Sequence, residues 1–239
     1  MTRRRWIADE VSGDRALIFG EHAAHLSRVL RVRVGQQFDV VTPLCVRRGQ
    51  IVAVNDDRVE FTLGDAIAES AVAPVTILLS IFKFDRMEWA IEKCTELGVT
   101  RIVPVISRRT EPHLASAAEK RVERWQRIAK QASEQARRSF VPEISAPVKL
   151  PLQLKDKTEI NDELCIVLSE NEREVLLRDL LKESTSKLLL ALGPEGGWAE
   201  EELALFAQRG WKSASLGNTI LRAETAAIAA TAIALSELQ

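Results

Sequence analysis

The pattern of hydrophobic positions changes character near Pro74. Before it, short apolar stretches are separated by Gly, Asn and Asp, as in RALIFG, QQFDVVTPLC, GQIVAVN and RVEFTLGDA. Strands at this spacing with such turn residues are typical of a small barrel or sandwich. One short helical piece, HAAHLSRVL, interrupts them, and the small residues of AIAESAVAP indicate a linker that ends at Pro74. We therefore expect a β-rich first domain over residues 1–72.

Beyond Pro74, continuous apolar runs alternate with amphipathic segments. The runs VTILLSIF, VTRIVPVIS, ELCIVLSE and KLLLALG predict strands that are buried on both faces of a sheet, and KSASLG predicts a shorter one. Apolar residues at helical spacing predict helices over 85–97, 116–136, about 172–182, 200–209 and 220–238. Such alternation indicates an α/β domain with a mainly parallel sheet, which we expect over residues 73–239.

Several residues in these segments have the types and spacing that are typical of helix ends. Asp85 with Glu88, and Ser116 with Glu119, have the spacing of an N-terminal cap and capping box. Gly98 and Gly210 stand where the helices before them are expected to end. For the last helix, Thr219 or Thr225 is the expected cap.

Composition excludes several classes of protein. The chain has 239 residues, of which 46% are hydrophobic and 28% charged, so a disordered chain is excluded. No apolar run approaches the roughly 18–20 residues that span a bilayer, and the basic N-terminus lacks the apolar segment of a secretory signal. Three widely separated cysteines without a CxxC pair predict neither a disulfide framework nor a zinc site. We expect a soluble, cytoplasmic protein without a metal.

Charge is unevenly distributed, although the net charge is only −1. Residues 1–50 hold nine arginines and no lysine against five acidic residues, and residues 101–150 hold eleven basic residues against five acidic ones. Phosphate binding depends on local potential rather than on the sum, and arginine is suited to forked phosphate recognition. These blocks are consistent either with solvated faces or with a nucleic-acid surface.

Two glycine-containing segments follow predicted strands and precede predicted helices. The first, LGPEGG at 192–197, lacks the residues of a P-loop and does not match G-x-G-x-x-G. The second, SLGNTILRAETA at 215–226, places Arg222 and Glu224 among small and apolar residues. Ligands of α/β sheets bind outside the carboxyl ends of the strands. A tight turn in the first segment and a structural ion pair in the second are the simpler alternatives.

Other polar groups favour structural roles. Around the first helix of the second domain stand the charged residues Lys83, Arg86, Glu88, Lys93 and Glu96, of which Lys93 and Glu96 are expected to pair with each other. The segment SEQARRSFVP is consistent with a solvated helix end or with a phosphate or base contact. The three histidines have neither metal-ligand nor triad spacing, and no nucleophile elbow is present, so covalent hydrolysis is not indicated.

Taken together, five segments resemble the ribosomal RNA small-subunit methyltransferase E family. They are KFDRMEWAIEKCTELGV, the P-x-x-x-R-R-T of 104–110, SEQARRSFVPEI, LGPEGGWAEEE and LGNTILRAETA, and the N-terminal HLSRVLRVRVGQQF also fits. The resemblance covers nearly the whole chain, and GPEGG followed by LRAETA is its most specific part.

The resemblance implies a homodimer of the SPOUT superfamily. Its members carry a trefoil-knotted α/β domain, preceded here by a PUA-like β-barrel that binds RNA. They transfer a methyl group from S-adenosyl-L-methionine to N3 of a specific uridine in 16S ribosomal RNA of the assembled small subunit. Carried over to this chain, the cofactor would contact Leu192, Gly193, Pro194, Glu195, Gly196, Gly197, Leu216, Gly217, Ile220, Leu221, Thr225 and Ala226.

The chemistry requires a group that stabilises negative charge on uracil, because N3 must lose a proton before it attacks. Arg222 is our candidate, with Glu224 orienting it or contacting the cofactor. No general base is identified, although Glu134 is available. Expected RNA-binding residues are Arg4, Arg5, Arg28, Arg31, Arg109 and Arg138.

Three alternatives remain open at this point. The same chemistry is compatible with another RNA substrate, since the sequence contains no code for substrate choice. A non-catalytic ribosome assembly factor would keep the fold but would not need both cofactor loops. A small-molecule enzyme would leave the arginines of the first domain unexplained.

Overall fold

The computed structural model describes residues 5–67, 74–136, 138, 140–155, 163–182 and 187–238. The chain divides into two compact units, one of residues 1–71 with 133–140 and one of residues 72–132 with 141–239. Segment 133–140 therefore groups with the first unit, whereas the sequence analysis assigns it to the second domain.

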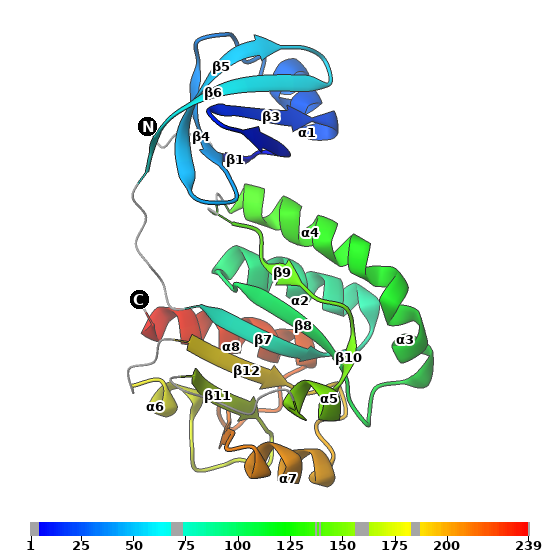
Figure 1. Ribbon diagram of the computed structural model, residues 1–239. Helices are drawn as coiled ribbons and strands as arrows, with labels where there is room; N and C mark the ends of the chain where they lie inside the picture. Colours follow the sequence, from blue (N-terminus) through cyan, green and yellow to red (C-terminus); the bar gives the residue numbers. More distant parts are fainter. Residues whose placement is uncertain are drawn as a thin grey trace. The chain divides into compact units, whose positions relative to one another are not determined.

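The first unit is built on a six-stranded sheet (Figure 1). Its strands are β1 (Arg5–Ile7), β2 (Glu10–Ser12), β3 (Arg15–Phe19), β4 (Gln37–Val41), β5 (Val46–Val54) and β6 (Arg58–Ala66), in the order β1-β4-β5-β6-β3-β2. β1 pairs with β4 in parallel, and the other pairs are antiparallel. α1 (Gly20–Ala24) and a π-helix (His25–Val29) form the expected helical piece. Alternate residues, such as Ala16 and Ile18 of β3, are buried in one apolar cluster.

The second unit contains a seven-stranded sheet in which every pair is parallel, as predicted. Its main order is β10-β8-β7-β12-β11-β13, and β9 pairs with β8. The strands are β7 (Val75–Ser80), β8 (Arg101–Ile106), β9 (Glu143–Ile144), β10 (Val148–Lys149), β11 (Glu163–Leu168), β12 (Lys187–Leu192) and β13 (Lys212–Ala214). The sequence analysis did not anticipate β9 and β10, which are too short to show a periodic pattern.

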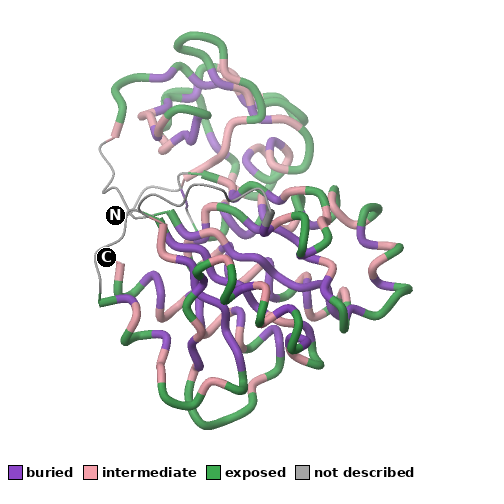
Figure 2. The backbone as a smooth tube through the Cα atoms, turned by 60° about the horizontal axis from the view of Figure 1, so that its bottom comes forward, coloured by how far each residue is buried: buried purple, intermediate pink, exposed green. Residues whose placement is uncertain are grey.

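Helices cover both faces of this sheet. They are α2 (Phe84–Leu97), α3 (Pro112–Ala117), a 3-10 turn (Ala118–Arg121), α4 (Val122–Gln135), α5 (Leu150–Lys155), α6 (Leu177–Leu180), α7 (Glu200–Gln208) and α8 (Ala223–Glu237). Successive residues of β12 belong to opposite cores: Leu188 and Leu190 pack with residues of α2 and α8, while Leu189 and Ala191 pack with residues of α5 and α7. Figure 2 shows these strands as buried chain. The continuous apolar runs thus reflect burial on both faces.

Two predicted helix starts are wrong. The long helical segment begins at Pro112, whose fixed φ suits a first helical position, and Ser116 donates a hydrogen bond to the carbonyl of His113 within that turn. α2 begins at Phe84 with Lys83 as its N-cap and has no side-chain cap, so Asp85 lies inside the helix rather than at its cap, and Glu88 accepts two hydrogen bonds from Arg124. The expected pair of Lys93 with Glu96 is confirmed, at 2.8 Å.

Two further helices are shorter than expected. The helix predicted over about 172–182 is limited to α6, because the Glu172 carboxylate accepts the amide hydrogens of Glu174 and Val175 and turns the chain. α8 starts at Ala223, after Arg222 in an extended conformation (ψ 153°). Its N-cap is Arg222 rather than Thr219 or Thr225. Within the described ranges, no helix is long and apolar enough to span a bilayer.

Candidate active site

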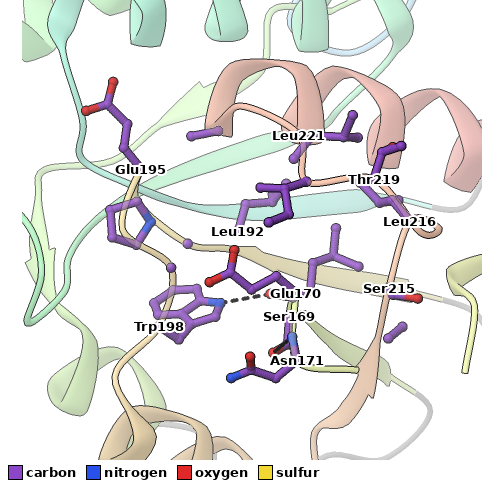
Figure 3. A pocket seen from close by; sticks show the side chains of 18 of the residues that line it. Ser169, Glu170, Asn171, Leu192, Glu195, Trp198, Ser215, Leu216, Thr219 and Leu221 are labelled. Atoms are coloured by element: carbon purple, nitrogen blue, oxygen red, sulfur yellow. Dashed lines mark hydrogen bonds between the residues drawn. The ribbon is translucent and has the colours of Figure 1, made fainter. Parts of the chain in front are cut away.

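Three loops leave the sheet of the second unit at one edge. Strands β12, β11 and β13 are neighbours and run in parallel, so their carboxyl ends lie together. The residues that follow them form a pocket (Figure 3). Its lining comes from all three strand ends and from the start of α8: Leu168, Ser169, Glu170, Asn171, Leu192, Gly193, Pro194, Glu195, Gly197, Trp198, Ala214, Ser215, Leu216, Gly217, Thr219, Ile220, Leu221, Ala223 and Ala226.

The loop after β12 needs glycine at two positions. Gly197 has φ +71°, and a Cβ there would lie 2.8 Å from the Glu170 carboxylate oxygen. A Cβ on Gly193 would lie 3.3 Å from the indole nitrogen of Trp198. That nitrogen donates a hydrogen bond of 3.0 Å to the carbonyl of Leu168. The glycine-rich segment therefore follows the end of β11 closely, which no residue with a Cβ permits without displacing its neighbours.

The loop after β13 is joined to the segment that follows β11. Ser215 and Leu176 form an isolated parallel bridge, and the amide of Leu177 donates to the Ser215 carbonyl at 2.9 Å. Gly217 turns the chain with φ +128°. These contacts place Leu216 and Leu221 beside the pocket.

The chemistry of the lining suits a ligand without phosphate. Apolar side chains, backbone groups and the two carboxylates of Glu170 and Glu195 line the pocket, and none of its described lining residues is a lysine or an arginine. A phosphate would meet the Glu170 carboxylate with no lining cation to compensate it, whereas a nucleoside that carries positive charge would be attracted. The residues present therefore fit S-adenosylmethionine, whose sulfonium and amino groups are cationic.

A charged cluster lies behind the glycine-rich loop. Arg86, near the start of α2, donates a hydrogen bond of 3.0 Å from Nη1 to Glu195. Its Nε lies 3.8 Å from a carboxylate oxygen of Glu224. Glu224 is only 4% exposed, and its other oxygen has no hydrogen-bond partner among the described residues. The cluster thus connects three segments of the unit.

The structure brings most of the predicted cofactor residues together. All of them line the pocket except Gly196 and Thr225. The Gly196 carbonyl instead accepts a hydrogen bond from Arg109, and Thr225 is exposed on α8. Sequence analysis missed the loop after β11, especially Glu170 and Asn171. The signal was present, since these polar residues directly follow a buried parallel strand.

The two predicted catalytic residues differ in exposure and in their partners. Arg222 is exposed at the N-cap of α8, and the described part of the chain places no carboxylate within ion-pair distance of it. Glu224 is buried and faces Arg86 rather than Arg222.

The predicted RNA-binding arginines differ in exposure. Arg28 forms an exposed ion pair with Asp56 at 3.1 Å, and Arg31 is exposed with φ +49°. Arg138 is buried, which lowers its pKa to about 10, and its guanidinium stacks 4.2 Å from the centre of the Phe140 ring. Arg5 lies on β1, Arg109 contacts Gly196 in the second unit, and Arg4 lies outside the described residues.

The sequence analysis expects no metal site. Across the described ranges, no group of three His, Cys, Asp or Glu side chains is arranged to hold a metal ion. Cys45, Cys94 and Cys165 are thiols rather than halves of a disulfide.

Comparison with known proteins identifies the family. Residues 68–235 match the family model of the RNA methyltransferase domain. The chain is 33% identical over 211 residues to ribosomal RNA small subunit methyltransferase E of Synechocystis sp., which covers 87% of this chain and 68% of that protein. It is 32% identical over 219 residues to the Rickettsia conorii protein of the same name, with coverage of 88% and 85%.

Solved structures agree. The crystal structure of ribosomal RNA small subunit methyltransferase E from Neisseria gonorrhoeae, bound to S-adenosyl methionine, matches with a TM-score of 0.81 at 28% identity. The match covers 97% of this chain and 96% of that one. The fold, the pocket and these relatives lead to one conclusion: the chain belongs to the ribosomal RNA small subunit methyltransferase E family of RNA methyltransferases.

Proposed function

We propose that this chain methylates small-subunit ribosomal RNA with S-adenosylmethionine as methyl donor, at N3 of a specific uridine in 16S RNA of the assembled subunit. The relatives named above are ribosomal RNA small subunit methyltransferases, and the Neisseria structure holds S-adenosyl methionine. The observation that carries the proposal is the pocket at the ends of β11, β12 and β13, which combines apolar lining, the Glu170 carboxylate and no lining cation among the described residues.

S-adenosylmethionine, when bound, supplies an electrophilic methyl group, so no metal is required. Within the pocket, Glu170 offers negative charge to a cationic ligand, and Leu192, Leu216 and Leu221 offer apolar contact. Backbone groups of the glycine-containing loops are available to bind the nucleoside.

Arg222 is the proposed catalytic cation. The uracil ring carries negative charge on O2 and O4 when N3 loses its proton, and a permanently charged guanidinium stabilises that charge. Arg222 stands exposed beside the pocket residues Leu221 and Ala223, without a carboxylate partner in the described ranges. It is therefore available to a substrate base.

For the first unit we propose a PUA-like barrel that binds RNA in the cytoplasm. Its exposed Arg28 and Arg31 are suited to phosphate contacts, since a guanidinium binds phosphate through paired donors. Affinity for RNA should then fall steeply as salt rises, because bound cations on the RNA are released.

For the second unit we propose a trefoil-knotted SPOUT domain that forms a homodimer. α8 supports the dimer, because apolar residues occur on all sides of it and Ile228 and Ile233 are only partly buried. Trp89 of α2 is 48% exposed, and α2 packs against α8. An additional copy of the chain would cover such a surface.

The test is methyl transfer. Small ribosomal subunits that lack the modification are incubated with the protein and labelled S-adenosylmethionine, and the product is mapped by nucleoside mass spectrometry. We expect N3-methyluridine in 16S RNA and no transfer to large subunits, which are the control. Transfer to a different RNA would overturn the substrate, and cofactor binding or RNA binding without transfer to any RNA would favour a non-catalytic assembly factor.

A further inference from the structure

Arg86 occupies an unusual position for a residue outside the pocket lining. It stands two residues after the start of α2, in the segment that follows β7, and it contacts acidic residues of two other loops. Glu195 belongs to the glycine-rich loop after β12, and Glu224 belongs to the first turn of α8. One guanidinium of α2 thus contacts two segments that each lie more than a hundred residues away from it in sequence.

The contact with Glu224 has an electrostatic reason. A carboxylate that is 4% exposed needs a compensating charge, because burial of an unpaired charge is costly. Arg86 is the cation within ion-pair distance of Glu224 among the described residues. Without it, the buried carboxylate would have to move toward water, and the start of α8 would move with it.

The contact with Glu195 has a geometric consequence. Glu195 lines the pocket, while its carboxylate is held from outside by Arg86 (Figure 3 shows the side chain pointing away from Glu170). Gly193 and Gly197 on either side of it lie against Trp198 and Glu170. The pocket face of this loop therefore depends on an anchor that does not itself line the pocket.

We propose that Arg86 is a positioning residue, which fixes the glycine-rich loop to the first turn of α8 through Glu195 and Glu224 and so sets the shape of the cofactor pocket. The proposal rests on the proposed function, since it concerns the same site. An arginine is required because its separate Nη1 and Nε donors serve two carboxylates at once, whereas a lysine ammonium is a single point charge.

The experiment is a double-mutant cycle on the full chain, with the dissociation constant of S-adenosylmethionine measured by calorimetric titration. The variants are Arg86→Gln, Glu195→Gln and the double variant. We expect Arg86→Gln alone to weaken binding about tenfold. In the Glu195→Gln background, the same substitution should weaken binding by a smaller factor, about threefold, because the contact with Glu195 is already lost and only the one with Glu224 remains to be removed.

Arg101→Gln is the matched control. Arg101 also forms an ion pair, with Glu143 at 3.3 Å, but it begins β8 at the opposite end of the strand from the pocket edge. This variant should bind S-adenosylmethionine like the wild type. If Arg86→Gln does not fold, as judged by thermal melting, Arg86→Lys replaces it in the cycle, with an expected loss of about threefold to fivefold.

The outcomes separate the two proposals. A wild-type chain that does not bind S-adenosylmethionine overturns the proposed function, and this inference with it. Wild-type binding that Arg86→Gln leaves unchanged overturns the role of Arg86 alone. An equal loss in both backgrounds would show a general effect on the fold, and would also overturn it.

Discussion

The indole nitrogen of Trp198 donates a hydrogen bond of 3.0 Å to the backbone carbonyl of Leu168. Leu168 is the last residue of β11, and Trp198 ends the glycine-rich loop that follows β12. The Trp198 ring also packs edge-on against Phe206 of α7, with 5.0 Å between centroids. The Trp198 side chain therefore connects the glycine-rich loop to the end of β11 and to α7. Both the loop and the end of β11 line the pocket.

Replacement of Trp198 with phenylalanine should keep the packing but lose this bond. The Leu168 carbonyl would be left buried without its donor, at a cost of about 1–2 kcal/mol in the free energy of unfolding. Affinity for S-adenosylmethionine should fall about fivefold, because the glycine-rich loop is no longer hydrogen-bonded to the end of β11. Urea unfolding and calorimetric titration measure the two effects. Trp125→Phe, at a buried tryptophan whose indole nitrogen has no hydrogen-bond partner among the described residues, is the control, and an equal effect of both variants would contradict the role of the bond.

Gly197→Ala should weaken cofactor binding because the new Cβ would displace the Glu170 side chain. Gly210→Ala is the control, since it has the same backbone strain without that contact. Gly197 and Gly210 have nearly the same φ, +71° and +74°. A Cβ at Gly210 meets nothing within 4 Å, whereas one at Gly197 lies 2.8 Å from Glu170. Both substitutions cost about 1 kcal/mol of backbone strain. Only Gly197→Ala should weaken S-adenosylmethionine binding, by at least about tenfold, and equal titrations for the two variants would refute the close approach to Glu170.

Cys94 predicts a pH dependence. Burial raises the pKa of its thiol to about 12, and Thr231 donates a hydrogen bond of 3.4 Å to its sulfur. The thiolate is the nucleophile, so iodoacetamide at pH 8 should modify the partly exposed Cys45 and spare Cys94 in the folded protein. Peptide mass spectrometry gives the modified positions, and reaction of both thiols at one rate would contradict the prediction.

The same shift destabilises the fold at alkaline pH. The unfolded chain loses the Cys94 proton near pH 9, whereas the folded chain keeps it until about pH 12. The unfolded state therefore binds fewer protons in this range, so the free energy of unfolding falls as pH rises, by at most about 4 kcal/mol. Cys94→Ala should lower stability at pH 7 but flatten its decline above pH 9, as measured by urea unfolding at each pH.

Much of this fold follows from the sequence, because burial on both faces of the parallel sheet leaves continuous apolar runs. The strands that line the pocket, β11, β12 and β13, each lie within a predicted strand. Helix ends were harder to predict, since tertiary contacts override local caps: Glu88 binds Arg124 on another helix, and its sequence neighbours do not reveal that partner.

The loops of the site were predictable from the sequence, but the charge pairing behind them was not. Glycine-rich loops after strands mark the pocket from sequence alone, whereas the partner of Glu224 does not follow from spacing. Arg222 is two residues away from Glu224 and Arg86 is far away in sequence, yet the fold pairs the buried carboxylate with Arg86. The packing of α2 against α8 brings the two residues together.

Arg222→Ala should separate catalysis from cofactor binding. Arg222 is exposed at the start of α8 and does not belong to the pocket lining, so the dissociation constant of S-adenosylmethionine should stay within about twofold of the wild type. Turnover on small ribosomal subunits should fall at least about 100-fold, because the developing charge on uracil loses its cation. Single-turnover methyl transfer measures this loss without interference from product release. Arg178→Ala, at an exposed arginine of α6, is the control for the removal of one positive charge. Equal turnover of the two variants would exclude Arg222 from the mechanism, and a parallel loss of cofactor affinity would make it a binding residue instead.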